Sequence, residues 1–123
     1  MVQEEIELLL KDICARLPYK PQVEIIKDGT SITDKLTTAT IKYLEYGYWE
    51  VKPYLYPLSS MTKEQSKELE EIDPEFYSLI CSNGEIYVSM DVRGYDWLNR
   101  NHFDYRGLIP MGLAIDCTNL NIY

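Results

Sequence analysis

The chain has 123 residues, and twenty acidic residues against twelve basic ones give it a formal net charge of −8. This length corresponds to a single domain over residues 1–123, and an apolar fraction of 46% supports a core that needs neither a disulfide nor a metal ion. The negative charge disfavours direct binding to nucleic acid or to an anionic membrane, because those surfaces are bound through lysine and arginine.

The N-terminus and the cysteines indicate a cytoplasmic protein. No basic segment precedes Leu8–Leu10, and this apolar run is too short and too closely flanked by charge for a signal peptide. No stretch approaches the ~18 apolar residues of a membrane-spanning helix. Cys14, Cys81 and Cys117 are widely spaced, which is typical of reduced thiols. We therefore expect no membrane association, no metal site and no cofactor.

The first predicted element is an amphipathic helix over residues 4–17. Its apolar residues recur at the i, i+3, i+4, i+7 spacing that places them on one face. Pro18 ends the helix by forcing the preceding residue out of the helical region. The apolar residues of this face are Ile6, Leu9, Leu10, Ile13 and Leu17.

Three strands are predicted next. Residues 23–27 form a short strand that ends at the turn Asp28-Gly29, a dipeptide typical of hairpins. Residues 38–45 and 48–56 are predicted as two longer strands on either side of Tyr46-Gly47.

Alternation assigns the two faces of the predicted strand 48–56. Trp49, Val51 and Leu55 share one face. Pro53 cannot donate a hydrogen bond to a neighbouring strand, so we expect this strand to lie at a sheet edge or to carry a bulge. The opposite face is rich in tyrosine and continues into the preceding turn. Its tyrosines are Tyr46, Tyr48, Tyr54 and Tyr56.

The middle of the chain contains a helix start and a second hairpin signal. Thr62 and Gln65 form a capping box, which predicts a helix that ends near Ile72. Asn83-Gly84, flanked by apolar and alternating residues, predicts a β-hairpin.

The last third of the chain is predicted to contain a short helix and a strand. Asp91 is placed to cap a helix over residues 92–101, and Asp104 is placed to cap a turn or short helix. Gly112 suits a left-handed position, after which residues 113–117 form a strand. Together, these elements predict an α+β domain. We expect a mainly antiparallel sheet of about five or six strands packed with the N-terminal amphipathic helix and two shorter helices.

Residues 95–109 are the densest in polar and aromatic side chains and include the only histidine. His102 is a candidate general base, with Asp104 or Asp96 as the carboxylate that orients it and Arg106 beside it. A zinc site is not indicated, because catalytic zinc needs three protein ligands and no second histidine exists. This set supports one hypothesis, a small hydrolase or nucleotide-modifying enzyme.

The same residues also have structural interpretations. His102 can close the helix end as a hydrogen-bonded residue near the core, and Asp104 can act as an N-cap. Arg106 can form an ion pair with an acid of residues 63–91, a segment with a net charge of −6. Cys81 and Cys117 lie in apolar segments and are predicted to be core residues.

Eleven tyrosines in 123 residues suggest a contact surface, because tyrosine provides a large contact area at a small entropic cost. The alternative is that a helix covers the tyrosine face and makes it a second core layer. A helix over residues 92–101 has large aromatic side chains on both sides, so it is clamped between two layers or exposes one of them. The candidate binding residues are Tyr46, Tyr48, Tyr54, Tyr56, Trp97 and Tyr105.

Several motifs resemble a known group of proteins. Residues 52–62 read KPYLYPLSSMT, and residues 96–99, 102–109 and 112–114 read DWLN, HFDYRGLI and GLA. Together with LKDICARLPY at 10–19, they are similar to a family of small uncharacterised proteins encoded by gut bacteria and their phages or prophages. The resemblance implies a setting, an accessory protein of a mobile element in a bacterial cytoplasm, and no particular activity.

Our leading hypothesis is a non-enzymatic binding protein that presents an acidic, tyrosine-rich surface to a protein partner. In a phage setting, a nucleic-acid-handling host protein is a plausible partner, since an acidic surface can occupy a basic groove. The enzyme described above is one alternative. A subunit of a homo-oligomer, with Trp97 and the tyrosine face as contacts, is the other.

Overall fold

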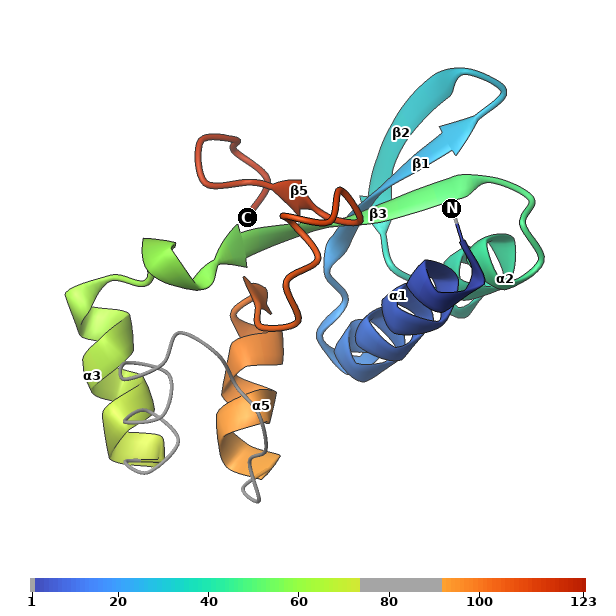
Figure 1. Ribbon diagram of the computed structural model, residues 1–123. Coiled ribbons are helices and arrows are strands. Elements are labelled where there is room, and N and C mark those ends of the chain that lie inside the picture. Colours follow the sequence, from blue (N-terminus) through green and yellow to red (C-terminus); the bar gives the residue numbers. More distant parts are fainter. Residues whose placement is uncertain (1, 74–91) are drawn as a thin grey trace.

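The computed structural model describes residues 2–73 and 92–123, and it shows the predicted α+β fold (Figure 1). Within these residues the sheet has five strands in the order β2-β1-β3-β4, with β5 also paired to β3. The pairs among β1, β2 and β3 are antiparallel, and β4 and β5 pair with β3 in parallel. None of the helices in the described ranges combines the length and hydropathy needed to cross a bilayer.

Helix α1, Gln3–Arg16, confirms the predicted N-terminal helix. Acidic residues in its first turn and Arg16 in its last turn complement the helix dipole. Its apolar face buries Leu9 and Ile13 completely. A short 3-10 turn, Leu17–Tyr19, follows at the position where Pro18 was expected to end the helix.

Strands β1, Gln22–Lys27, and β2, Thr30–Lys35, form a hairpin with a continuous register of six residue pairs. The turn between them is Asp28-Gly29, as predicted, with φ values of 50° and 83° that match a two-residue hairpin turn. The sequence prediction did not include β2. All six of its residues are exposed, so it lacks the alternation of apolar and polar residues by which strands are recognised.

The prediction of a strand at residues 38–45 is wrong, because this segment is helix α2, Thr38–Glu45. Thr37 caps its N-terminus and accepts a hydrogen bond from the Thr40 amide. Thr40 and Leu44, four residues apart, are its buried residues, and the helix packs against α1. The β-branched and aromatic residues favoured a strand in the prediction, and tertiary packing with a local cap overrides that preference.

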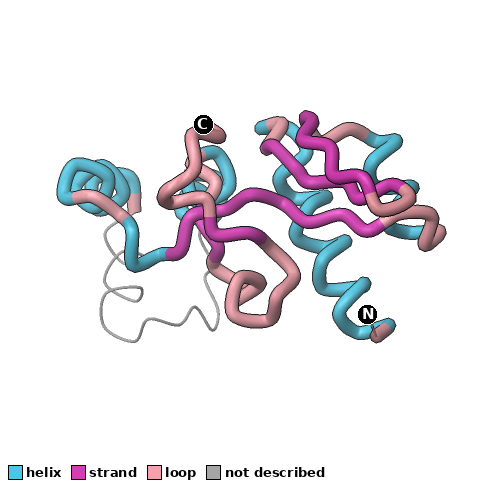
Figure 2. Tube along the Cα trace, turned by 90° about the horizontal axis from the view of Figure 1, so that it is seen from above, coloured by secondary structure: helices cyan, strands magenta, loops and turns pink. Residues whose placement is uncertain are grey.

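Strand β3, Glu50–Pro57, runs through the centre of the sheet (Figure 2). It pairs with β1 up to Pro53 and then with two short strands, β5, Ile115–Asp116, and β4, Phe103–Asp104. The expectation that Pro53 marks a sheet edge or a bulge is therefore wrong for the strand as a whole, since the register with β1 is continuous up to Pro53 and other partners follow. Pro53 lies where the partner changes, the point at which a missing amide hydrogen disturbs the pairing least.

Two apolar clusters lie at the two ends of β3. The first packs α1 and α2 against β1 and β3, and it includes Leu108 and Leu113 of the C-terminal loop. The second lies between α3, Lys63–Ile72, α5, Val92–Arg100, and β4, with Trp97 at its centre. Figure 1 shows these two pairs of helices at opposite ends of β3.

The capping box of Thr62 and Gln65 is present at the start of α3. Cys117 is buried as predicted, and burial raises the pKa of its thiol to about 11. The predicted hairpin around Asn83-Gly84 and the prediction for Cys81 lie outside the described residues.

We expect Gly29→Ala to lower the free energy of unfolding by about 1–2 kcal/mol, because a Cβ is strained at the left-handed φ of this turn. No atom lies within 4 Å of the added Cβ, so the loss measures backbone strain and not a clash. Urea denaturation followed by circular dichroism measures the change. Gly29→Asn is the matched control, because asparagine tolerates this conformation and should be the more stable variant. Equal stability of the alanine variant and the wild type would contradict the assignment of the turn.

Candidate functional site

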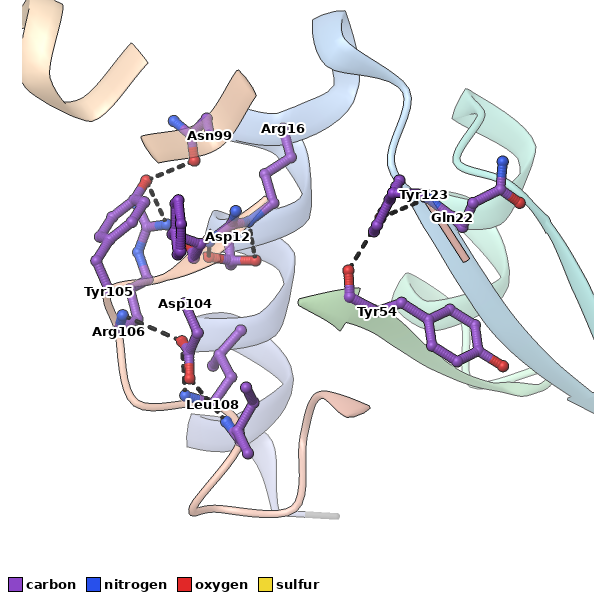
Figure 3. A network of polar contacts seen from close by, with 12 residues as sticks. Asp12, Arg16, Gln22, Tyr54, Asn99, Asp104, Tyr105, Arg106, Leu108 and Tyr123 are labelled. Atoms are coloured by element: carbon purple, nitrogen blue, oxygen red, sulfur yellow. Dashed lines mark hydrogen bonds and ion pairs between the residues drawn. The ribbon is translucent and has the colours of Figure 1, made fainter. Parts of the chain in front are cut away.

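A buried ionic network lies where α1 meets the C-terminal third of the chain (Figure 3). Asp12 is fully buried and accepts hydrogen bonds from two arginines. Its Oδ2 is 2.8 Å from Arg16 Nε, and its Oδ1 is 2.8 Å from Arg106 Nη1. Arg16, one turn further along α1, is also fully buried, so both partners of this pair are out of water. A buried ion pair of this kind is stable only while each charge keeps its partner.

The network extends to β4 and α5. Arg16 Nη2 donates to the carbonyl oxygen of Phe103 at 2.7 Å, which ties α1 to β4. Tyr105 accepts a hydrogen bond from Arg106 Nη1 at 2.9 Å, and its hydroxyl donates to Asn99 Oδ1 at 2.8 Å. The two guanidinium groups also lie over the Tyr105 ring, 4.6 and 5.2 Å from its centroid. The side chain of Tyr105 is thus engaged in holding three elements together.

Asp104 caps the turn that follows β4, as its position in the sequence predicted. Its two carboxylate oxygens accept hydrogen bonds from the backbone amides of Arg106, Leu108 and Ile109, at 3.3, 3.0 and 2.9 Å. Arg106 was expected to pair with an acid of residues 63–91. In the described chain its ion pair is with Asp12 of α1, so the expected partner is not found among residues 63–73.

His102 lies at the end of α5 in a left-handed conformation, with φ of 64°. Its ring stacks on Tyr123, with centroids 3.8 Å apart and planes 9° apart. Burial, together with the positive charge of Arg16, lowers the pKa of His102 to about 4. The imidazole is therefore neutral at pH 7 and is a weak base. Among the described residues, its Nδ1 has no hydrogen-bond partner, so neither Asp104 nor Asp96 orients the ring through this atom.

The pocket beside the ionic network does not bring the candidate catalytic residues together. A pocket of about 570 Å³ lies beside the ionic network, and its lining includes Arg106 but not His102, Asp104 or Asp96. Asp96 is exposed on α5. In residues 2–73 and 92–123, no three histidine, cysteine or acidic side chains come together as ligands for a metal ion. The lining residues are Leu8, Lys11, Ala15, Tyr95, Asn99, Tyr105 and Arg106.

The predicted tyrosine face does not form a single surface. Tyr46 and Tyr48 are 63% and 66% exposed, and their ring centroids are 5.9 Å apart. Tyr54 is only 6% exposed, and its hydroxyl contacts Thr33 Oγ1 at 3.3 Å. Tyr56 is half-buried against Phe103 and Tyr123 at the other end of β3. The tyrosines before the strand and those within it thus lie in different environments.

Trp97, the tryptophan among the candidate binding residues, is buried in the second apolar cluster. Its indole Nε1 donates to Glu68 of α3 at 3.0 Å, and its ring stacks on Phe103. Trp97 therefore clamps α5 between α3 and β4, which is one of the two arrangements expected from the sequence. Of the six predicted binding residues, Tyr46 and Tyr48 are the ones that present their rings to solvent.

A groove of about 500 Å³ includes Tyr48, one of these two exposed tyrosines, in its lining. Trp49 forms its aromatic wall and meets the Tyr43 ring edge-on, with centroids 4.4 Å apart. The ammonium group of Lys27 lies 4.4 Å from the centroid of the Trp49 ring. Carboxylates line the groove as well as apolar side chains. Its lining residues are Ile6, Ile26, Asp28, Gly29, Leu44, Gly47, Tyr48, Trp49 and Glu50.

Most of this lining was missed by the sequence prediction. The groove joins the first turn of α1, the β1–β2 turn and the loop between α2 and β3, and the last of these was interpreted as a hairpin turn. The available signal was the cluster of four aromatic residues within positions 43–49, which is unusually dense for a two-residue turn. Comparison of the chain with protein-family models, curated protein sequences and solved structures found no significant match.

We expect Asp12→Asn to lower the free energy of unfolding by about 3–5 kcal/mol, because it leaves the buried Arg16 without its counter-charge. Urea denaturation provides the measurement. Glu7→Gln is the matched control, since Glu7 is exposed on the same helix and its loss should cost less than about 0.5 kcal/mol. A loss for Asp12→Asn as small as that of the control would show that the network is not needed for stability.

We expect protonation of His102 to lower the free energy of unfolding as the pH drops from about 6.5 to about 4. The unfolded chain binds the proton near the ordinary pKa of 6.5 and the folded chain near 4, so acid favours the unfolded state between these values. The measurement is the difference in unfolding free energy between wild type and His102→Asn across this range, where asparagine tolerates the left-handed backbone. Parallel pH profiles for the two proteins would refute the lowered pKa.

Proposed function

We propose that this protein is a non-enzymatic binding protein and that the groove beside Tyr48 and Trp49 docks a basic segment of a partner protein. The observation that carries the proposal is the groove itself, in which exposed tyrosine, partly buried tryptophan and carboxylate groups come together. Its volume of about 500 Å³ falls within the roughly 300–1,000 Å³ range of ligand sites.

The aromatic side chains support a role in recognition. Tyrosine and tryptophan bury large areas while fixing few rotatable bonds, and they are enriched at the centres of interfaces. Tyr46 and Tyr48 are more than 60% exposed, although tyrosine is commonly half-buried in a folded domain. Their burial by a partner would remove a large apolar area from water.

The charge around the groove supports a cationic ligand. Asp28 and Glu50 line it, with Glu50 in an exposed ion pair with Lys52 at 3.4 Å. The acidic first turn of α1 lies next to Ile6 of the lining. The ring faces of Trp49 and Tyr43 already attract one cation, the ammonium group of Lys27. A lysine or arginine of the partner would compete with Lys27 for these rings and would meet the carboxylate groups that line the groove.

The partner class follows from this chemistry and from the net charge of −8. An acidic protein of this size is attracted to basic surfaces, and long-range attraction speeds the encounter. The resemblance noted from the sequence provides the setting, an accessory protein of a phage or other mobile element in the cytoplasm. We infer that its partner is a host protein with a basic groove, of the kind that handles nucleic acids.

We expect Tyr48→Ser to weaken binding of a basic, aromatic probe at least about tenfold, as expected for loss of a central aromatic contact. The probe is a nine-residue peptide of alternating arginine and phenylalanine. Binding is followed by the emission of Trp49 in a Trp97→Phe background, so that a single tryptophan reports from the groove.

Two controls accompany this measurement. Met111→Ser removes another exposed apolar side chain, 47% exposed and distant in sequence from the groove lining, and should bind the peptide like the parent. Binding should also weaken as salt is raised. The proposal fails if a peptide with glutamate in place of arginine binds equally well, or if Tyr48→Ser has no effect.

A further inference from the structure

The outer edge of β2 is unpaired in the described part of the chain. β2 is an end strand of the sheet, and all six of its residues are exposed. Its register with β1 is continuous, with no bulge and no proline within the strand. Natural proteins usually protect edge strands with such features, because an open edge is a template for another strand.

The backbone groups at this edge can be assigned to individual residues. Leu36 donates its amide hydrogen to Pro21 at 2.8 Å, so this residue directs its backbone groups toward the β1 side. Because directions alternate along a strand, Ser31, Thr33 and Lys35 direct their N–H and C=O groups outward. The amide of Lys35 agrees with this assignment, because it bonds to the Asp34 side chain at 2.7 Å. Ser31 and Thr33 thus present their backbone groups to an incoming strand.

We propose that this edge pairs with β2 of a second copy of the chain, antiparallel and around a twofold axis at Ile32. In such a dimer, directly opposed residues must lie on the same face of the joined sheet. Pairing Ile32 with its own copy satisfies this condition. It also places Ser31 opposite Thr33 of the second copy, and each of these two pairs exchanges both backbone hydrogen bonds.

The side chains favour this register. At the axis, two Ile32 side chains, each 39% exposed in the single chain, would cover each other. Thr30 lies opposite Asp34 of the second copy, so a hydroxyl meets a carboxylate and no like charges are opposed. A register shifted to centre on Thr33 would place the apolar Ile32 opposite Asp34. The strand is therefore self-complementary in one register.

The positions of the charged residues in β2 also favour a second copy of the chain as the partner of this edge. Residues 30–33 are uncharged, and the charged residues Asp34 and Lys35 lie at the end of the strand. In the proposed register neither of them faces its own copy. This dimer does not depend on the proposed groove function, and it differs from the oligomer expected from the sequence, which used Trp97 and the tyrosine face.

Sedimentation equilibrium over increasing concentration tests the proposal. We expect the mean mass to rise from 14.4 kDa toward twice that value. Two edge variants should each shift dimerisation to at least about tenfold higher concentration. Ile32→Lys places two positive charges opposite each other at the axis, and Ser31→Pro removes an amide hydrogen that points outward. Leu120→Lys is the matched control at another exposed apolar residue, and it should not change dimerisation. Circular dichroism confirms that each variant is folded.

The register is tested by disulfide formation. Ile32→Cys in a background of Cys14→Ser and Cys81→Ser should form a cross-linked dimer under mild oxidation. Opposed Cα atoms in a non-hydrogen-bonded antiparallel pair lie about 4.5 Å apart, within reach of a disulfide. Thr30→Cys in the same background should not cross-link, because its copies lie about 13 Å apart. A monomer at all concentrations, a dimer that both edge variants leave intact, or equal cross-linking at the two positions would overturn the proposal. A monomer would leave this edge to a strand of a different protein.

Discussion

The arrangement of this molecule depends on the ion pairs that the fully buried carboxylate of Asp12 forms with two arginines. This carboxylate is the counter-charge for Arg16 in its own helix and for Arg106, which lies 94 residues away along the chain. Removing charges from water costs several kcal/mol per ion, and this cost is offset only because each oxygen of Asp12 receives a short hydrogen bond. Through Arg16 and the Phe103 carbonyl, the same carboxylate determines where β4 lies against α1.

This constraint explains why the candidate catalytic side chains are engaged in structural contacts in the described structure. Asp104 is engaged with three backbone amides, Arg106 with Asp12 and Tyr105, and His102 with the ring of Tyr123. Groups held in this way stabilise the meeting point of α1, α5 and β4, and a base with a pKa near 4 has little tendency to take a proton at neutral pH. The exposed rings of Tyr46 and Tyr48 lie outside this network, at the C-terminal end of α2 and in the loop that follows it.

The sequence predicts those parts of the fold in which local signals and tertiary packing agree. The apolar stripe and Pro18 define α1, the capping box defines the start of α3, and Asp28-Gly29 defines the hairpin turn. Prediction fails where the two disagree. α2 consists of residues with strand preference but is capped by Thr37 and buried against α1, and β2 has no apolar alternation because it buries no side chain. The cap made by Asp104 is local and was predictable, whereas the pairing of Arg106 with Asp12 depends on the three-dimensional arrangement of distant segments.

The hairpin connects the two surfaces for which we propose functions. Its turn, Asp28-Gly29, lines the aromatic groove, and its outer strand is the open edge. An antiparallel pair of β2 strands would place the two turns at opposite ends of the joined strands, roughly 20 Å apart at ~3.3 Å per residue. Two grooves at a fixed separation would bind a partner that carries two basic segments more tightly than either groove alone, because the second contact becomes intramolecular. A groove of modest affinity is then sufficient, because pairing of the edge strands would supply the avidity.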